Sequence, residues 1–140
     1  MSTEIRPQIS PKSPWWIERH RYYELKHFCL QYPVWKKAYA ALDGLSKRSN
    51  DMDIFVKSGQ IRGDPTAKCA VAKVHYSERI ELVEQTAART DPELAKYILL
   101  GVTEGWSYAA LRYKFNIPCC KDTYYDRYRK FFWLLNKERP

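Results

Sequence analysis

The cationic side chains near the end of the chain are the residues best suited to contact another molecule. Between positions 106 and 140, eight Lys or Arg residues stand against three acidic residues, and the formal net charge of the whole chain is +8. Clustered positive charge attracts phosphate more strongly than the same charge spread over a surface. The segment is therefore expected to recognise a nucleic-acid backbone, and its uncharged polar side chains are suited to contact base edges.

Two predicted helices with a break between them would position these side chains. Ser107 is a typical N-cap for the first helix, and residues 116–119 interrupt the helical pattern before the second. A small residue near the bend, Ala109 or Ala110, and an apolar plug, Ile117, are typical of a helix-turn-helix. The side chains expected to face the core are Ala110, Leu111, Phe115, Tyr124, Tyr128, Phe131 and Leu135.

The start of the second helix carries the candidate contacts to DNA, because the first turns of a recognition helix enter the major groove. The candidates for contacts to base edges are Lys121, Asp122, Thr123, Tyr125 and Asp126. The candidates for contacts to phosphates are Arg127, Arg129 and Lys130. The two acids could accept a hydrogen bond from cytosine N4, but capping and support of neighbouring side chains is the preferred interpretation. The competing interpretation of the segment is a basic helix that is only solvated.

Helical signals also cover most of the preceding sequence, so the predicted fold class is all-α, a helical bundle with a C-terminal helix-turn-helix. Residues 1–12 lack periodicity and are expected to form a flexible arm. A first helix is predicted from Ser13 and Pro14, a hydroxyl cap followed by proline. A second helix is predicted from about Pro33 until Asp43 and Gly44 break it. We expect these two helices to form a hairpin.

The middle of the chain predicts one long helix and one short helix. Residues 43–63 are expected to be a connection with one brief helix, because polar residues and glycines interrupt its apolar patch. Asp64 and Pro65 start a helix that lasts until about Arg89, and Asp91 starts another that loosens at Gly101 and Gly105. The predicted division is an arm (1–12), a helical hairpin with its connection (13–63) and a helical core (64–140) that contains the helix-turn-helix (91–140).

Cysteine and histidine spacing gives no sign of a metal site or of a disulfide framework. The residues concerned are Cys29, Cys69, Cys119, Cys120, His20, His27 and His75. We expect reduced structural thiols and surface imidazoles. No nucleophile has a recognisable base beside it, and no glycine-rich phosphate loop is present. The sequence therefore predicts no cofactor, no metal and no enzymatic activity.

Composition favours a folded protein in the cytoplasm. The 140 residues are 45% hydrophobic and 15% aromatic, enough to build one compact unit with an appendage. No run of about 18 apolar residues is present, and the first residues are not of signal-peptide type. The prediction is a soluble protein of a bacterial host cell, associated with the nucleoid and with no membrane partner.

Several short runs in the last third of the chain carry a family resemblance. They are Asp91-Pro92-Glu93, Tyr97-Ile98, Val102-Thr103-Glu104-Gly105, Ser107-Tyr108, Leu111, Ile117-Pro118-Cys119, Tyr124-Tyr125 and Arg129-Lys130-Phe131-Phe132. This pattern resembles the RinA and ArpU families, late transcriptional activators of phages and prophages of Gram-positive bacteria. Their C-terminal helices are similar to the promoter-reading region 4 of sigma factors. The resemblance implies that residues 121–130 read promoter DNA.

Three functional hypotheses follow. The first is a phage-type regulator of transcription that binds double-stranded DNA in a sequence-specific manner and offers its N-terminal helices to RNA polymerase, another host protein or a second copy. The second is a small terminase subunit that recognises packaging DNA and assembles into rings. The third is a phage-encoded interaction or inhibitor protein that acts on a host protein or nucleoprotein complex. Mass in solution separates the first two hypotheses.

Overall fold

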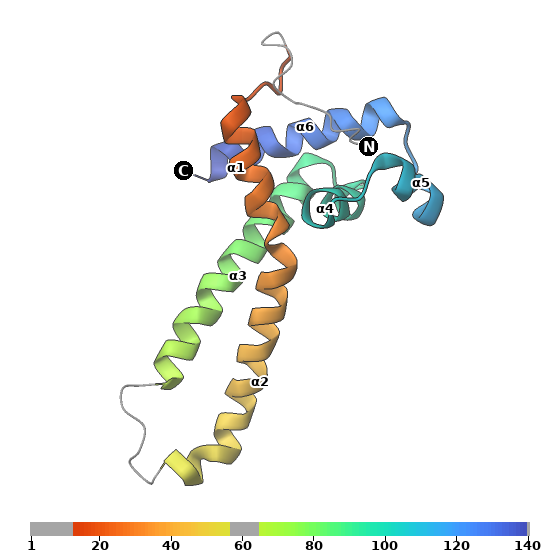
Figure 1. The fold of residues 1–140 in the computed structure, drawn as a ribbon. Helices are drawn as coiled ribbons and strands as arrows, with labels where there is room; N and C mark the ends of the chain where they lie inside the picture. The colour runs from red at the N-terminus through yellow and green to blue at the C-terminus, as the bar shows by residue number, and fades with distance from the viewer. Residues whose placement is uncertain (1–12, 57–64, 140) are drawn as a thin grey trace. The chain divides into compact units, whose positions relative to one another are not determined.

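Six α helices and no strands make up the part of the chain that the computed structural model describes, residues 13–56 and 65–139, without the side chains of 45–56 and 65–66 (Figure 1). The helices are α1 (Arg19–Leu30), α2 (Tyr32–Val56), α3 (Pro65–Thr90), α4 (Ala95–Glu104), α5 (Tyr108–Phe115) and α6 (Lys121–Glu138). The predicted all-α class is confirmed. The predicted arm (1–12), the Asp64 cap and the last part of the predicted connection lie outside the described residues.

The chain divides into two compact units, one formed by Met1–Tyr32 with Leu82–Pro140 and the other by Pro33–Glu81. In the first unit, α1, α4 and α6 pack against one another, and α5 packs on α6. Their meeting faces are strongly aromatic: the rings of Tyr22 and Phe132 meet edge to face at 5.1 Å. The hydroxyls of Tyr22 and Tyr128 lie 3.2 Å apart. The core therefore fixes α6 from two sides, by α1 and by α4.

The first helix begins later than predicted. Glu18, and not Ser13, is the N-cap of α1, and its carboxylate accepts from the backbone N–H of Arg21 at 3.0 Å. Ser13 instead accepts from the backbone N–H of Trp15 at 3.3 Å, within a turn. The physical reason is the packing of the residues between them. Trp15 contacts α6 and Ile17 is buried, so the chain turns at residues 13–15, is not helical at residues 16–18, and begins α1 only after the extended Glu18.

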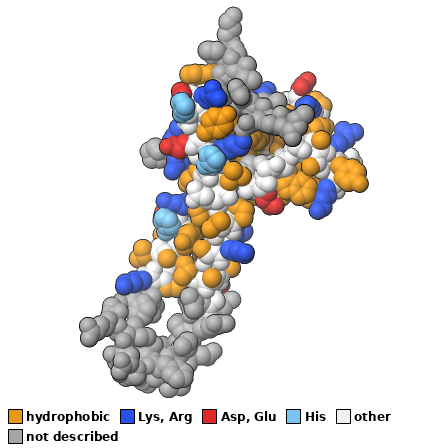
Figure 2. Space-filling view, in the orientation of Figure 1, with side chains coloured by type: hydrophobic (Ala, Val, Ile, Leu, Met, Phe, Trp, Pro, Cys, Tyr) orange, Lys and Arg blue, Asp and Glu red, His pale blue; other side chains and the backbone are white. Residues whose placement is uncertain are grey.

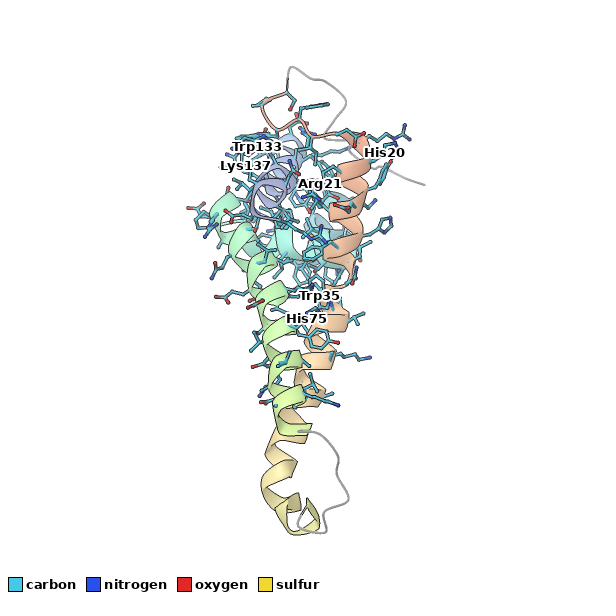
Figure 3. All side chains as sticks on the ribbon, turned by 90° about the vertical axis from the view of Figure 1, so that its left-hand side faces the viewer. His20, Arg21, Trp35, His75, Trp133 and Lys137 are labelled. Atoms are coloured by element: carbon cyan, nitrogen blue, oxygen red, sulfur yellow. The ribbon has the colours of Figure 1, made fainter. Side chains whose placement is uncertain are left out.

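The second unit corrects two predictions. Helix α2 does not break at Asp43 and Gly44 but continues to Val56. Asp43 stays helical because its carboxylate accepts from Lys73 Nζ of α3 at 3.1 Å. The predicted hairpin of the first two helices is also wrong, since α1 packs against α4 and α6. Only Gln31 separates α1 from α2, fewer residues than a helical hairpin loop uses. Helix α2 instead runs antiparallel to α3 (Figures 1 and 3).

The sequence signals for the start of α3 and for the two ends of α4 were predicted correctly in part. Helix α3 begins at Pro65, as predicted. The Asp91 carboxylate accepts from the backbone N–H groups of Glu93 and Leu94 at 3.0 and 3.3 Å, in a turn that precedes α4. Gly105 ends α4 in the left-handed region, with φ 75°. Gly101 does not loosen the helix: a Cβ there would lie 2.0 Å from the Tyr124 hydroxyl, so glycine permits the close approach of α6 to α4.

Candidate nucleic-acid interface

Helix α5, the connection 116–120 and helix α6 form the candidate interface. The Ser107 hydroxyl accepts from the backbone N–H of Ala110 at 3.1 Å, which confirms the predicted cap. Asn116 ends α5 with φ 53°, in the left-handed region that asparagine tolerates better than most residues. Ile117 is buried in the connection, as predicted for the apolar plug. A short helix, a five-residue connection and a long helix therefore follow one another here.

Tyr108 ties α5 to the start of α6. Its hydroxyl donates to the carbonyl of Cys119 at 2.6 Å, just before α6 begins. Its backbone N–H donates to the hydroxyl of Tyr125 at 3.3 Å. Leu111, one turn along α5, is fully buried. These contacts hold the first turn of α6 in one position relative to α5.

The structure corrects the placement of two aromatic side chains. Tyr125 was a candidate for base contact, but it is only 8% exposed. Its ring meets those of Tyr124 and Tyr128 edge to face at 5.0 and 6.0 Å, so it belongs to the core face of α6. Phe115 was expected to point inward, yet it is 42% exposed. Helix α5 buries only Leu111, which leaves its last turn facing solvent.

The first turn of α6 is exposed. Cys120, Lys121 and Asp122 are exposed and Thr123 is half-buried. The Thr123 hydroxyl lies 3.2 Å from Cys120 Sγ. Hydrogen bonding to Thr123 lowers the pKa of the Cys120 thiol below its ordinary value. In contrast, burial raises the pKa of the neighbouring Cys119 thiol. This end of α6 also carries the positive pole of the helix dipole, which favours a nearby anion.

Arg127 is held by acids. Its Nε donates to Asp91 Oδ2 at 3.2 Å, and its Nη1 donates to Asp126 Oδ2. Asp126 also accepts from Trp15 Nε1 at 3.1 Å, in agreement with the predicted supporting role for this acid. The guanidinium that was a candidate for phosphate contact thus neutralises two carboxylates of its own chain.

Trp15 covers part of the outward face of α6. Lys130 Nζ lies 5.6 Å from the centre of a Trp15 ring, and the Trp15 and Trp133 rings meet edge to face at 5.1 Å. Figure 3 shows Trp133 beside Lys137, whose Nζ lies 3.5 Å from the indole centre. Arg129 lies half-buried on the same helix. Residues 126–130 of α6 are all half-buried and are therefore less accessible than Lys121 and Asp122 of the first turn.

Helix α5 adds residues that were not assigned from the sequence. Tyr113 is 94% exposed, between the exposed Arg112 and Lys114. Arg112 Nη1 donates to the Tyr108 hydroxyl at 3.5 Å, and Lys114 Nζ lies 5.2 Å from a ring centre of Trp106. Figure 2 shows Lys and Arg side chains next to hydrophobic ones in the region of α5. The three consecutive residues after Leu111 are the sequence signal that was overlooked.

Three further features of the described residues concern metal ligands, buried titratable groups and membrane spans. No three His, Cys, Asp or Glu side chains among them are grouped so that they could hold a metal ion. Burial raises the pKa of Cys29 and of Tyr128 above their ordinary values. In the described part of the chain, no helix has the length and apolar character to cross a membrane.

Comparison of the chain with models of protein families, with curated proteins and with solved structures finds no match in any of the three. The resemblance to the RinA and ArpU families therefore stays a prediction.

Proposed function

We propose that the chain binds double-stranded DNA through a helix-turn-helix formed by α5, residues 116–120 and α6, with the first turn of α6 in the major groove. The observation that supports this proposal is the exposed start of α6, braced across α5 by Tyr108. A recognition helix needs both properties, because its leading residues must be accessible and must be held in a fixed direction.

The contacts divide between base edges and phosphates. Lys121, Asp122 and Thr123 are the proposed contacts to base edges, since they lie on the exposed turn. Arg112 and Lys114 of α5 join the proposed contacts to phosphates, because both are exposed, and Arg112 donates to the Tyr108 hydroxyl that contacts Cys119 just before α6.

The phosphate candidates on α6 differ in the partners that hold them. Arg129 keeps its place as a candidate. Arg127 would have to give up Asp91 before it could reach a phosphate, and Lys130 is half-buried beside Trp15, whereas Lys114 stays exposed beside Trp106. Arg127 and Lys130 are therefore secondary contacts in this proposal.

The biological role that we propose is regulation of phage or prophage transcription in the bacterial cytoplasm, with no enzymatic activity. The family resemblance of residues 91–132 supports this role. RNA polymerase is the proposed protein partner, since a late activator must contact it. The positive charge of the chain supports association with DNA in the nucleoid.

Selection of bound duplexes from a random pool tests the base contacts. We expect a defined motif for the unmodified chain and a different motif for Lys121→Ala, because a side chain that contacts a base edge discriminates among base pairs. Absence of any enriched motif, or the same motif for both chains, would contradict the groove assignment.

A salt titration tests the phosphate contacts. We expect the double variant Arg112→Ala/Lys114→Ala to lower the slope of log K against log salt by about 2, since each lost phosphate contact removes about 0.9. The matched control is Lys36→Ala/Lys37→Ala, which removes the same charge from exposed positions of α2. If both double variants gave the same slope of log K against log salt, the loss of any two positive charges would explain the change, and the phosphate contacts of Arg112 and Lys114 would be contradicted.

A further inference from the structure

Tyr113 of α5 is the most exposed large hydrophobic side chain of the described residues. It is 94% exposed, so both faces of its ring meet solvent. A helical side chain leans toward the residue one turn earlier, which here is Ala109. Ala109 is also exposed, and its methyl group is too small to cover the ring. A bare ring of this size gains free energy when a flat apolar surface covers it.

Two cations flank Tyr113 on α5. Because an α helix turns by about 100° per residue, Arg112 and Lys114 lie on either side of the ring around the helix axis. Both are exposed. Arg112 Nη1 donates to the Tyr108 hydroxyl at 3.5 Å, and Lys114 Nζ lies 5.2 Å from a ring centre of Trp106. Each cation therefore has a defined position and is still accessible to an anion.

This stretch of the chain carries no negative charge of its own. Between Glu104 and Asp122 the sequence contains no acidic residue, and Lys121 adds a third cation at the start of α6. Arg127, in contrast, is paired with acids of its own chain. The cations around Tyr113 therefore favour a ligand that is negatively charged.

A nucleotide strand combines the two features that this surface complements, because each of its units carries a flat base and a negative phosphate. An acidic peptide would supply the charge but no flat ring at each residue. In a duplex the faces of the bases are covered by the neighbouring base pairs, so Tyr113 has no base face to stack on. Proteins that bind single strands combine exposed aromatic rings with cations in the same way.

We propose that α5 binds an unpaired strand of DNA, with one base stacked on the ring of Tyr113 and neighbouring phosphates at Arg112 and Lys114. This contact goes beyond the proposed groove contact of α6. The choice of DNA over RNA rests on the proposed function: Tyr108 connects α5 to the start of α6, so a DNA molecule with a paired and an unpaired stretch can occupy both helices.

The first test compares two single strands of equal charge, oligo-dT of about 12 nucleotides and an abasic strand of the same length. Fluorescence anisotropy measures the affinity of the full chain for each. We expect the bases to raise the affinity about 5- to 100-fold, as base–aromatic stacking does. Tyr113→Ala should remove this gain and leave binding of the abasic strand unchanged. Equal affinities of the unmodified chain for the two strands would overturn the proposal.

Two further variants at the same position separate stacking from a general apolar contact. Tyr113→Phe keeps the ring and should keep the gain that the bases provide. Tyr113→Leu keeps an apolar side chain without a ring and should lose most of it. A full gain for Tyr113→Leu would rule out stacking. The position is 94% exposed, so these changes should leave the fold intact, and circular dichroism checks this expectation.

The cations and the chemical class of the ligand are tested with the same strands. Arg112→Ala/Lys114→Ala should weaken binding of both strands by the same factor, because both carry the phosphates. Polyglutamate of equal charge should displace oligo-dT poorly. Equally good displacement would mean that the surface recognises charge alone, as an acidic protein would require. Binding of oligo-U more than about tenfold tighter than oligo-dT would overturn the choice of DNA.

These strands contain no duplex, so the result is separable from the proposed groove contact. A chain that binds oligo-dT through Tyr113 but binds no duplex would contradict the proposed function and keep the strand contact. A chain that selects a duplex motif but gains nothing from the bases of oligo-dT would contradict this inference alone.

Discussion

The two halves of α6 carry similar cations but hold them differently. Lys121 stands on the exposed first turn, whereas Arg127 pairs with Asp91 and Asp126. Lys130 lies against the indole of Trp15, in the segment before α1. The difference shows that positive charge in a sequence is not the same as charge available to a ligand. Partners from distant parts of the chain decide which cations remain available.

The same comparison separates the first turn of α6, which we propose to recognise DNA, from the later turns, which pack in the core. The later turns pack against α1 through Phe132 and against the segment before α1 through Trp133. The first turn is connected to α5 by Tyr108 and approaches α4 at Gly101. Three experiments test this division.

The largest effect concerns the contact that fixes the start of α6. Gly101→Ala should lower the free energy of unfolding by about 1–3 kcal/mol, because the new methyl group would overlap the Tyr124 hydroxyl. That hydroxyl is buried and has no hydrogen-bond partner among the described residues. Tyr124→Phe should therefore cost nothing or stabilise the fold. Urea unfolding of each variant measures both quantities.

The double variant Gly101→Ala/Tyr124→Phe distinguishes this contact from a general intolerance of α4. We expect most of the loss to be recovered, because the overlapping oxygen is gone and alanine favours the helix over glycine by about 1 kcal/mol. If the double variant were as unstable as the changes of the two single variants added together, the overlap with the Tyr124 hydroxyl would not be the cause of the loss, and this contact would not place α6.

The second experiment removes the cover from the later turns. Trp15→Ala deletes an edge-to-face ring pair and a hydrogen bond to Asp126, and should lower the free energy of unfolding by about 1–2 kcal/mol. It should also free Lys130. Lys130→Ala should then flatten the salt dependence of DNA binding in the Trp15→Ala chain but leave it almost unchanged when Trp15 is present. An equal effect in both chains would show that Trp15 does not restrict Lys130.

The sequence predicted most helix starts but not the contacts that cover a helix. Ser107 and Pro65 act as local signals, because a cap or a fixed φ works within one turn of the chain. Asp43 and Gly44 failed as a break, because a salt bridge from α3 keeps Asp43 in the helix. Long-range partners of this kind leave no local pattern.

In the candidate site, too, the exposure set by the helical pattern was predictable, but the long-range partners were not. Lys121 and Asp122 lie on the exposed turn, where the helical pattern placed them. Tyr125 was misplaced because the core face of α6 is wider than one stripe, and it includes Tyr125 and Phe132 beside the predicted positions. The pairing of Arg127 with Asp91 joins residues 36 positions apart, and no spacing rule could have predicted it.

The smallest effect is a difference in reaction rate that reports on the first turn alone. Cys120 is exposed and its pKa is lowered by hydrogen bonding to Thr123, whereas the pKa of Cys119 is raised, chiefly by burial. The thiolate is the reactive form, so a lowered pKa moves the onset of alkylation to lower pH. Cys120 should therefore react with iodoacetamide at lower pH than Cys119. Buried Cys29 should react only after unfolding. Peptide mass spectrometry assigns each site.

Bound duplex should slow alkylation of Cys120, because this residue directly precedes the turn that would enter the groove. Cys69 is the control, since it lies on α3 in the other compact unit and its rate should not change. Slower alkylation of Cys120 with an unchanged Cys69 rate would place the duplex at the start of α6. Protection of neither thiol by a saturating duplex would mean that the DNA contacts another surface, and the division of α6 into a recognising half and a stabilising half would then be wrong.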